Sequence, residues 1–246
     1  MFRMSSMIAL FFVGSMQLGF AQRQEHGFFS EMARPIWNVV AGSPKPLVMQ
    51  SPDGLSRATA IYIEDVRGNE HIELSISGEI GRLELNIGPG VGSELLWAPD
   101  SKAFFVTTSD EGGNGRYRLI VVGAFAGELQ HRELTDLISA EFGHPFRCGW
   151  PESPNVAGIG WSADSHYLWV AAEVIAHSNC DSDGTFEAYE VNTSKMGIVR
   201  KLNQLEAKRE LSPMLGKELR AAPDECVRDP KLCYVSTNHP ELNQYK

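Results

Sequence analysis

The chain has 246 residues, of which 43% are hydrophobic and 22% are charged, with 22 lysines and arginines against 31 aspartates and glutamates. The hydrophobic content excludes a disordered acidic chain, and the net charge of −9 excludes a protein that binds nucleic-acid phosphates through a basic surface. The length allows one domain of moderate size or two small ones.

Residues 1–21 have the pattern of a cleaved export signal. Arg3 supplies a positive charge, and residues 7–20 form an uncharged, mostly apolar run that is shorter than the ~20 residues of a membrane-spanning helix. Small residues precede a cleavage site after Ala21, so we expect the mature chain to begin at Gln22. The signal predicts a periplasmic or extracellular protein that is not inserted in the membrane after cleavage.

The four cysteines all follow the predicted signal, and an even number of cysteines in an exported chain predicts two disulfides. Three pairings are possible. Cys226 and Cys233 are close in sequence and are expected to close a small ring, which leaves Cys148 to pair with Cys180. A zinc site is the alternative, but the chain has no C-x-x-C motif to support it.

An internal repeat is the most informative feature of the sequence. Each copy contains a tight Asp-Ser or Asp-Gly turn between two segments of high β propensity. The two clear copies are Trp97-Ala98-Pro99-Asp100-Ser101 and Trp161-Ser162-Ala163-Asp164-Ser165, and a weaker one is Ser51-Pro52-Asp53-Gly54. Further strands are expected at residues 116–122, 128–134, 185–191 and 196–202. Each unit thus contains four short strands, which is the pattern of a propeller blade.

The turn and the aromatic-rich strand that follows it resemble the WD40-like, or TolB-like, β-propeller repeat of exported bacterial proteins. The resemblance covers residues 45–202 and implies a mainly β fold of about three four-stranded antiparallel blades. Propellers close with 4–8 blades, so three blades imply a partial or open propeller. Trp97 and Trp161 occupy equivalent positions and are expected to pack between blades rather than bind a ligand.

The segments that flank the repeats are predicted to be an N-terminal extension at residues 22–44 and a helical segment with an irregular tail at residues 203–246. The extension contains one possible strand, Ile36 to Val40, which is expected to complete the first sheet. Residues 203–222 are expected to be helical, with Ser212 as an N-cap before Pro213. Met214, Leu215 and Leu219 are expected to form the buried face of this segment.

The predicted blade topology brings two loops to one end of the strands. The connection from the second to the third blade contains His144 and Trp150, and the central hairpin of the third blade contains His177, Asp181 and Asp183. These five residues are the candidate binding site, because binding residues concentrate on loops. The alternative is that residues 143–160 are a surface ornament held by Cys148.

No cofactor is predicted, although residues 179–190 match the spacing of a calcium loop, with Asp181 and Asp183 among the oxygen ligands. Such a loop requires a helix on each side, and the flanking segments here have the alternation of strands. A polar hairpin turn explains the same residues.

The sequence favours an exported, non-catalytic binding or scaffold module with a protein or small-molecule partner, because it contains no G-x-S-x-G or H-E-x-x-H motif. One alternative is a hydrolase or lyase with a site near His144, His177 and Asp181. The other is a structural subunit whose open sheet edges pair with a second copy.

Overall fold

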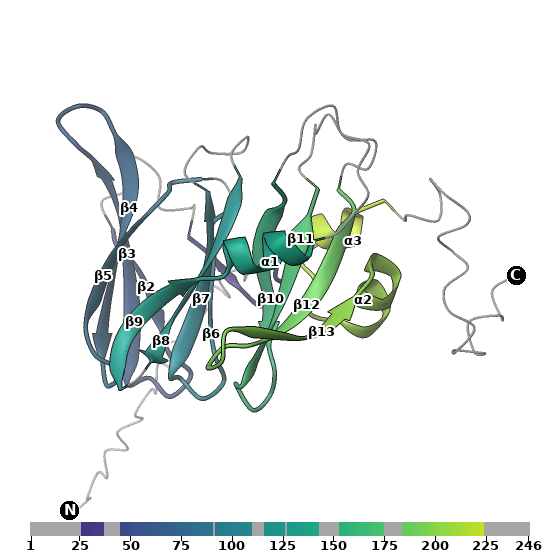
Figure 1. Cartoon of the computed structure of the whole chain (residues 1–246). Helices are drawn as coiled ribbons and strands as arrows, with labels where there is room; N and C mark the ends of the chain where they lie inside the picture. Colours follow the sequence, from purple (N-terminus) through teal and green to yellow (C-terminus); the bar gives the residue numbers. More distant parts are fainter. Residues whose placement is uncertain are drawn as a thin grey trace, which may run out of the picture.

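Three antiparallel sheets follow one another along the chain in the computed structural model, which describes residues 26–36, 45–90, 92–109, 116–125, 127–142, 153–174 and 184–223. Figure 1 displays the sheets side by side, from the first in blue to the third in green. Consecutive strands pair within each sheet, so each sheet is a propeller-like blade. The predicted mainly β fold is confirmed, and the three blades form an open stack.

The first blade comprises β2 (Leu47–Gln50), β3 (Ser56–Glu64), β4 (Glu70–Gly78) and β5 (Leu83–Ile87). The second comprises β6 (Glu94–Trp97), β7 (Ala103–Ser109), β8 (Tyr117–Phe125) and β9 (Glu128–Glu133). The third comprises β10 (Asn155–Trp161), β11 (Tyr167–Glu173), β12 (Phe186–Asn192) and β13 (Gly197–Leu202). A helix that the repeat pattern did not predict, α1 (Thr135–Glu141), joins the second blade to the third.

The described part of the N-terminal extension contributes a strand to the second blade. β1 (Arg34–Pro35) pairs with β6, which gives the second sheet five strands in the order β1-β6-β7-β8-β9. Ile36 follows β1 and inserts into the core between the first two blades. The rest of the strand expected at Ile36 to Val40 lies outside the described residues, so its pairing with the first sheet stays a prediction.

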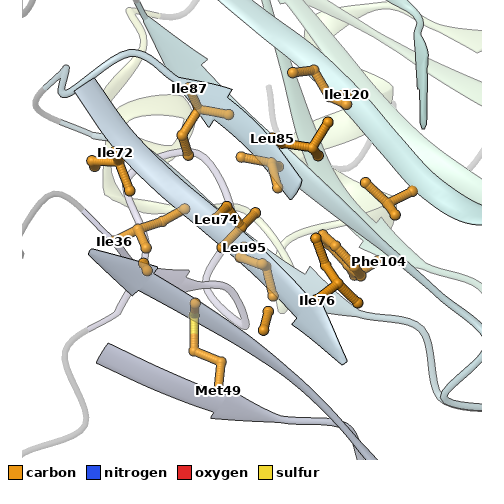
Figure 2. Packing of buried hydrophobic residues seen from close by; sticks show 14 of the residues in the cluster. Ile36, Met49, Ile72, Leu74, Ile76, Leu85, Ile87, Leu95, Phe104 and Ile120 are labelled. Carbon is orange, nitrogen blue, oxygen red and sulfur yellow. The ribbon is translucent and has the colours of Figure 1, made fainter. Parts of the chain in front are cut away.

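Two hydrophobic cores hold the stack together. The core between the first two blades includes Ile72, Leu74 and Leu85 on one side and Leu95 and Phe104 on the other, as Figure 2 displays. The core between the second and third blades includes both Phe105 and Trp161. Trp161 also donates its indole N–H to the carbonyl of Leu96, at 3.1 Å, which confirms that it packs between blades.

Gly158 allows the second and third blades to approach closely. A Cβ atom at this position would lie 2.5 Å from the Phe105 ring, which is too close for any side chain. The Gly158 backbone N–H also donates to the Thr107 hydroxyl at 3.0 Å. The glycine therefore allows a strand of one blade to lie against the aromatic core of the next.

The helical segment covers the outer face of the third blade. It contains α2 (Gln204–Glu210) and α3 (Lys217–Ala221), and α2 begins at an Asn203 capping box. The expected N-cap at Ser212 is wrong, because Ser212 lies in the turn after α2 and α3 begins after Gly216. Leu215 and Leu219 are buried as expected, against residues of the third blade, and Met214 is half-buried.

The repeated turns lie at one end of the stack, which we name the turn end. In each turn the aspartate accepts a backbone N–H from two residues further along: Leu55 to Asp53, Lys102 to Asp100 and His166 to Asp164. The predicted capping role of Asp100 and Asp164 between the first and second strands is thus confirmed. These bonds also hold the pKa of Asp53 and Asp164 below its usual range, with Ser51 and Ser162 as the main contributors.

The same turns connect neighbouring blades through a serine. The Asp53 N–H donates to the Ser101 hydroxyl, and the Asp100 N–H donates to the Ser165 hydroxyl, each at 3.0 Å. Both serines have a left-handed backbone, with φ of 64° and 63°, whereas the first blade has Gly54 at φ 75°. In the second and third blades a serine adopts this strained conformation, and its hydroxyl accepts a hydrogen bond from the preceding blade.

This arrangement predicts different effects for two substitutions of Ser101. Ser101→Ala should lower the free energy of unfolding by about 1 kcal/mol, because the Asp53 N–H loses its acceptor. Ser101→Gly loses the same bond but relieves a left-handed strain of about 1 kcal/mol, so it should be nearly neutral. Urea denaturation of both variants tests this prediction. Equal destabilisation by the two substitutions would contradict it.

Candidate functional site

The opposite end of the stack, which we name the loop end, is where the predicted site residues belong in the topology. His144, Trp150, His177, Asp181 and Asp183 themselves lie outside the described residues. The four cysteines, Cys148, Cys180, Cys226 and Cys233, also lie outside them, so their pairing stays a prediction.

The strands that flank the two predicted loops end next to one another. Asn155, at the start of β10, pairs with Glu173, at the end of β11, and Glu173 pairs with Phe186, at the start of β12. The connection before β10 and the hairpin between β11 and β12 therefore depart from adjacent strand ends. This register agrees with the prediction that both loops belong to one end of the blade.

A buried polar contact joins the second and third blades at the loop end. The Asn155 side chain donates to Glu173 Oε2 at 3.3 Å, and its own oxygen accepts the Tyr117 backbone N–H at 3.1 Å. The other Glu173 oxygen, Oε1, is buried and has no hydrogen-bond partner among the described residues. A buried polar atom without a partner is uncommon in folded proteins and marks a position where a further polar group would be stabilising.

Burial raises the pKa of Glu173 to about 8, and the negative charge of Glu218 adds to the effect, while the bond from Asn155 opposes it. The carboxyl group is therefore largely protonated at neutral pH. In this state it can donate one hydrogen bond as well as accept others. Glu173 can thus satisfy either a donor or an acceptor of a bound molecule.

A second buried carboxyl group, Glu94 at the start of β6, holds the N-terminal segment. It accepts the backbone N–H groups of Phe28, Phe29 and Ser30 at 2.6, 3.3 and 3.0 Å. Burial raises the pKa of Glu94 to about 8, although the three N–H bonds act in the opposite direction. A Cβ atom at Gly27 would lie 2.4 Å from Glu94 Oε2, so this close approach requires glycine.

The segment held by Glu94 also contacts the C-terminal helices. The Gly216 N–H donates to the Phe29 carbonyl at 2.7 Å, and the Glu218 N–H donates to the Phe28 carbonyl at 3.0 Å. Arg220 forms an ion pair with Glu31. The beginning and the end of the described chain are therefore joined at the loop end.

We name Glu94, Glu173, Glu218 and Tyr117 the carboxyl cluster. Burial raises the pKa of Tyr117 to about 12, and the charges of Glu218, Glu173 and Glu94 each add to the shift. The Tyr117 ring lies 4.8 Å from that of Phe29, in an edge-on arrangement. Glu94 is committed to the N-terminal segment, so Glu173 is the member of the cluster with an oxygen left for a further hydrogen bond.

The sequence contains a signal for two members of this cluster. Glu173 follows Ala171 and Ala172 in a buried strand, and Glu94 precedes Leu95 and Leu96. A single carboxylate inside an apolar β segment is an exception to the usual exposure of glutamate. The prediction from the loops alone did not include Glu94 and Glu173.

Among the described residues, no group of three histidine, cysteine, aspartate or glutamate side chains is placed to hold a metal ion. The residues of the calcium alternative, Asp181 and Asp183, are outside that part of the chain. The described helices also include none that is long and apolar enough to cross a membrane.

Comparisons with known proteins give a limited result. No family model matches the sequence, and no curated protein matches it. One similar solved structure is the β-propeller domain of the Trilobed protease from Pyrococcus furiosus, described as having an open velcro topology. The TM-score is 0.38 and the identity is 12%, over 64% of this chain and 42% of that chain. The chain thus spans less than half of that structure, and the blade assignment here depends on the strand order and the register.

The bonds of Glu94 predict that Glu94→Gln loosens the N-terminal segment. Glutamine keeps the size of the side chain but presents an NH₂ group to backbone donors, so at least one N–H bond is lost. Amide hydrogen exchange at Phe28, Phe29 and Ser30 should accelerate by about tenfold or more. Glu128→Gln, at an exposed position of β9, is the charge control. Unchanged exchange at the three amides would contradict the assigned role.

The raised pKa of Glu173 predicts that stability falls as the pH rises. Between its ordinary value of 4.5 and about 8, the folded chain retains the Glu173 proton and the unfolded chain has released it. The free energy of unfolding then falls by up to about 1.4 kcal/mol per pH unit for this group, and Glu94 acts in the same direction.

Urea denaturation at about pH 5 and about pH 8 tests this dependence. The wild-type chain should be less stable at the higher pH, and Glu173→Gln should remove part of the difference. A Glu173→Gln chain with an undiminished difference would show that another group is responsible.

Proposed function

We propose that this protein is an exported, non-catalytic binding module and that it binds its partner at the loop end. The observation that carries the proposal is the unpartnered, buried Oε1 of Glu173 beside the carboxyl cluster. An atom of this kind reduces stability unless another group completes its hydrogen bonds. A bound molecule at the loop end would supply that group.

The contrast between the two ends of the stack supports the choice of face. At the turn end, Asp53, Asp100 and Asp164 each accept a hydrogen bond from within their own turn. Ser101 and Ser165 are occupied by bonds between blades. These polar groups of the turns are committed to the fold. The buried Trp97 Nε1 beside the second turn lacks a partner among the described residues, but it belongs to the core between the first two blades.

The flanks of the stack support a self-contained unit over a structural subunit. The outer face of the first blade is largely polar, with Arg57, Glu84 and Asn86 exposed, and it also includes the exposed Val48. The outer face of the third blade is covered by α2 and α3. A largely polar outer face and a helical cap both terminate a stack of repeats, because neither presents a large apolar face that a second copy would bury.

The export signal at residues 1–21 supports a periplasmic or extracellular location. Catalysis is not part of the proposal. The residues of the hydrolase or lyase alternative, His144, His177 and Asp181, lie outside the described part of the chain, and no described group supplies a reason to prefer it.

Site-specific photo-cross-linking tests the proposed binding face. The chain from Gln22 would carry a benzoylphenylalanine at Glu141, the exposed last residue of α1 before the connection to the loop-end start of β10, or at Lys102, an exposed position of the turn end. Both positions belong to the second blade or its connection, so they are matched in folding context. In an envelope extract, Glu141 should give a discrete cross-linked product that Lys102 does not give.

The opposite pattern, with a product at Lys102 alone, would place the binding face at the turn end. Products of equal yield at both positions would indicate non-specific contact. Glu173→Gln should reduce the yield at Glu141 if the carboxyl cluster contributes to binding, and it should leave the folded spectrum unchanged.

A further inference from the structure

The central hairpin of the first blade extends beyond its own sheet. β3 and β4 pair along nine residues each, from Ser56 opposite Gly78 to Glu64 opposite Glu70. β2 pairs with β3 only as far as Ala60, and β5 pairs with β4 only as far as Ile72. The segment from Ile61 to His71 is therefore an arm, which projects at the upper left of Figure 1 at the loop end.

The arm has a defined backbone. Asp65 accepts the backbone N–H groups of Arg67 and Asn69, at 2.7 and 2.9 Å, and Gly68 adopts a φ of 79° at the tip. The bond from the Asp65 N–H to the Asn69 carbonyl closes the hairpin. This tight turn preorganises the two strands of the arm, which reduces the entropy cost of binding.

One edge of the arm is open. The Ser51 N–H bonds to the Ser56 carbonyl, and antiparallel pairing alternates, so Ala58 and Ala60 direct their main-chain groups toward β2. Tyr62 and Glu64 continue this series beyond the end of β2. Their N–H and C=O groups face a side where no described strand pairs with them, which is the geometry that accepts an added strand.

The arm has three acidic side chains, Glu64, Asp65 and Glu70, and one arginine, Arg67. Glu64 and Glu70 stand directly opposite each other, and the bond between Asp65 and Asn69 places them in a non-hydrogen-bonded pair, where side chains are closest. Like charges in this position are destabilising. Both carboxylates are exposed, and the described ion pairs include neither of them.

Two more features adjoin this pair. The Tyr62 side chain lies beside it, and its interaction with Glu70 raises the pKa of the tyrosine to about 12, with the charge of Glu64 adding to the effect. Val66 is fully exposed at the tip. A cationic side chain placed between the carboxylates would relieve their repulsion and lie near an aromatic ring, and an apolar neighbour would contact Val66.

We propose that the open edge of β3 at Tyr62 and Glu64 binds an extended segment of a protein partner that carries lysine or arginine, by adding it as a strand. The inference rests on the proposed binding function at the loop end and names the class of partner. A second copy of this chain is a poorer occupant, because pairing two such edges would bring two acidic tips together.

Fluorescence anisotropy with a defined peptide tests the proposal. The probe is a labelled eight-residue peptide of alternating lysine and valine, added to the chain from Gln22. The double variant Glu64→Gln with Glu70→Gln should weaken binding by about tenfold or more, since two charge-assisted contacts are lost. It should also be at least as stable as the wild type, because the repulsion is removed, so weaker binding cannot result from unfolding.

A matched double variant is Glu79→Gln with Glu84→Gln, which removes two exposed acids of the same sheet away from the arm and should leave binding unchanged. The same peptide with alternate N-methylated residues keeps its charge but cannot pair as a strand, and it should bind at least about tenfold more weakly. Equal binding of the methylated peptide would overturn strand addition. Equal effects of the two double variants would overturn the assignment to the arm.

The test separates this inference from the proposed function. A cross-linked product at Glu141 that survives in the Glu64→Gln, Glu70→Gln variant, together with no binding of the lysine–valine peptide, would refute the arm and leave the loop end as the binding face. Peptide binding that depends on Glu64 and Glu70, without any product at Glu141, would support the arm and refute the carboxyl cluster as the site.

Discussion

The structure depends on the carboxyl group of Glu94, which accepts three consecutive backbone N–H groups from the N-terminal segment. An extended segment near a chain terminus is poorly ordered unless other parts of the protein hold it in place. Here one buried side chain from the second blade replaces the main-chain partners that the segment lacks. With Phe28 and Phe29 fixed, their carbonyls accept from Glu218 and Gly216, so the helical cap is positioned by the same interaction.

This closure joins residues far apart in the sequence without completing a ring. β1 adds to the second blade, and Ile36 enters the core between the first two blades. Phe29 belongs to the core between the third blade and the helices. One short segment therefore contacts all three blades or their cap, and it compensates for blades that a closed propeller would have supplied.

The sequence was sufficient to predict the parts of the fold that depend on local patterns. The turns around Asp100 and Asp164 use neighbouring side chains and backbone groups, so their residues specify them directly. The repeat identified Ser101, which has a φ of 64°. It did not predict the hydrogen bond from Asp53 to Ser101, because the two residues are 48 positions apart in the sequence. The pairing of β1 was missed for the same reason, since the edge of β6 that it occupies is created by the tertiary fold.

The five predicted site residues lie outside the described part of the chain, so the candidate site stays a prediction. The loops were identified from blade topology, and the described strand ends at Asn155, Glu173 and Phe186 agree with it. The apolar neighbours of Glu94 and Glu173 mark each of them as an exception in the sequence, but nothing local indicates that they lie near each other or near Glu218. The three residues come from three different elements, and their proximity depends on how the blades and the helices pack.

The outer faces of the first and third blades are closed in different ways. A blade needs an apolar neighbour on each face, and the first blade avoids this need with a polar outer face while the third uses α2 and α3. The turn end is fixed by bonds between blades at Ser101 and Ser165. The Glu64–Glu70 repulsion and the unpartnered Glu173 oxygen both occur at the opposite end. Each end therefore has energetic costs: the turn end contains the left-handed serines, and the loop end contains polar groups whose interactions a bound partner would complete under the proposed function.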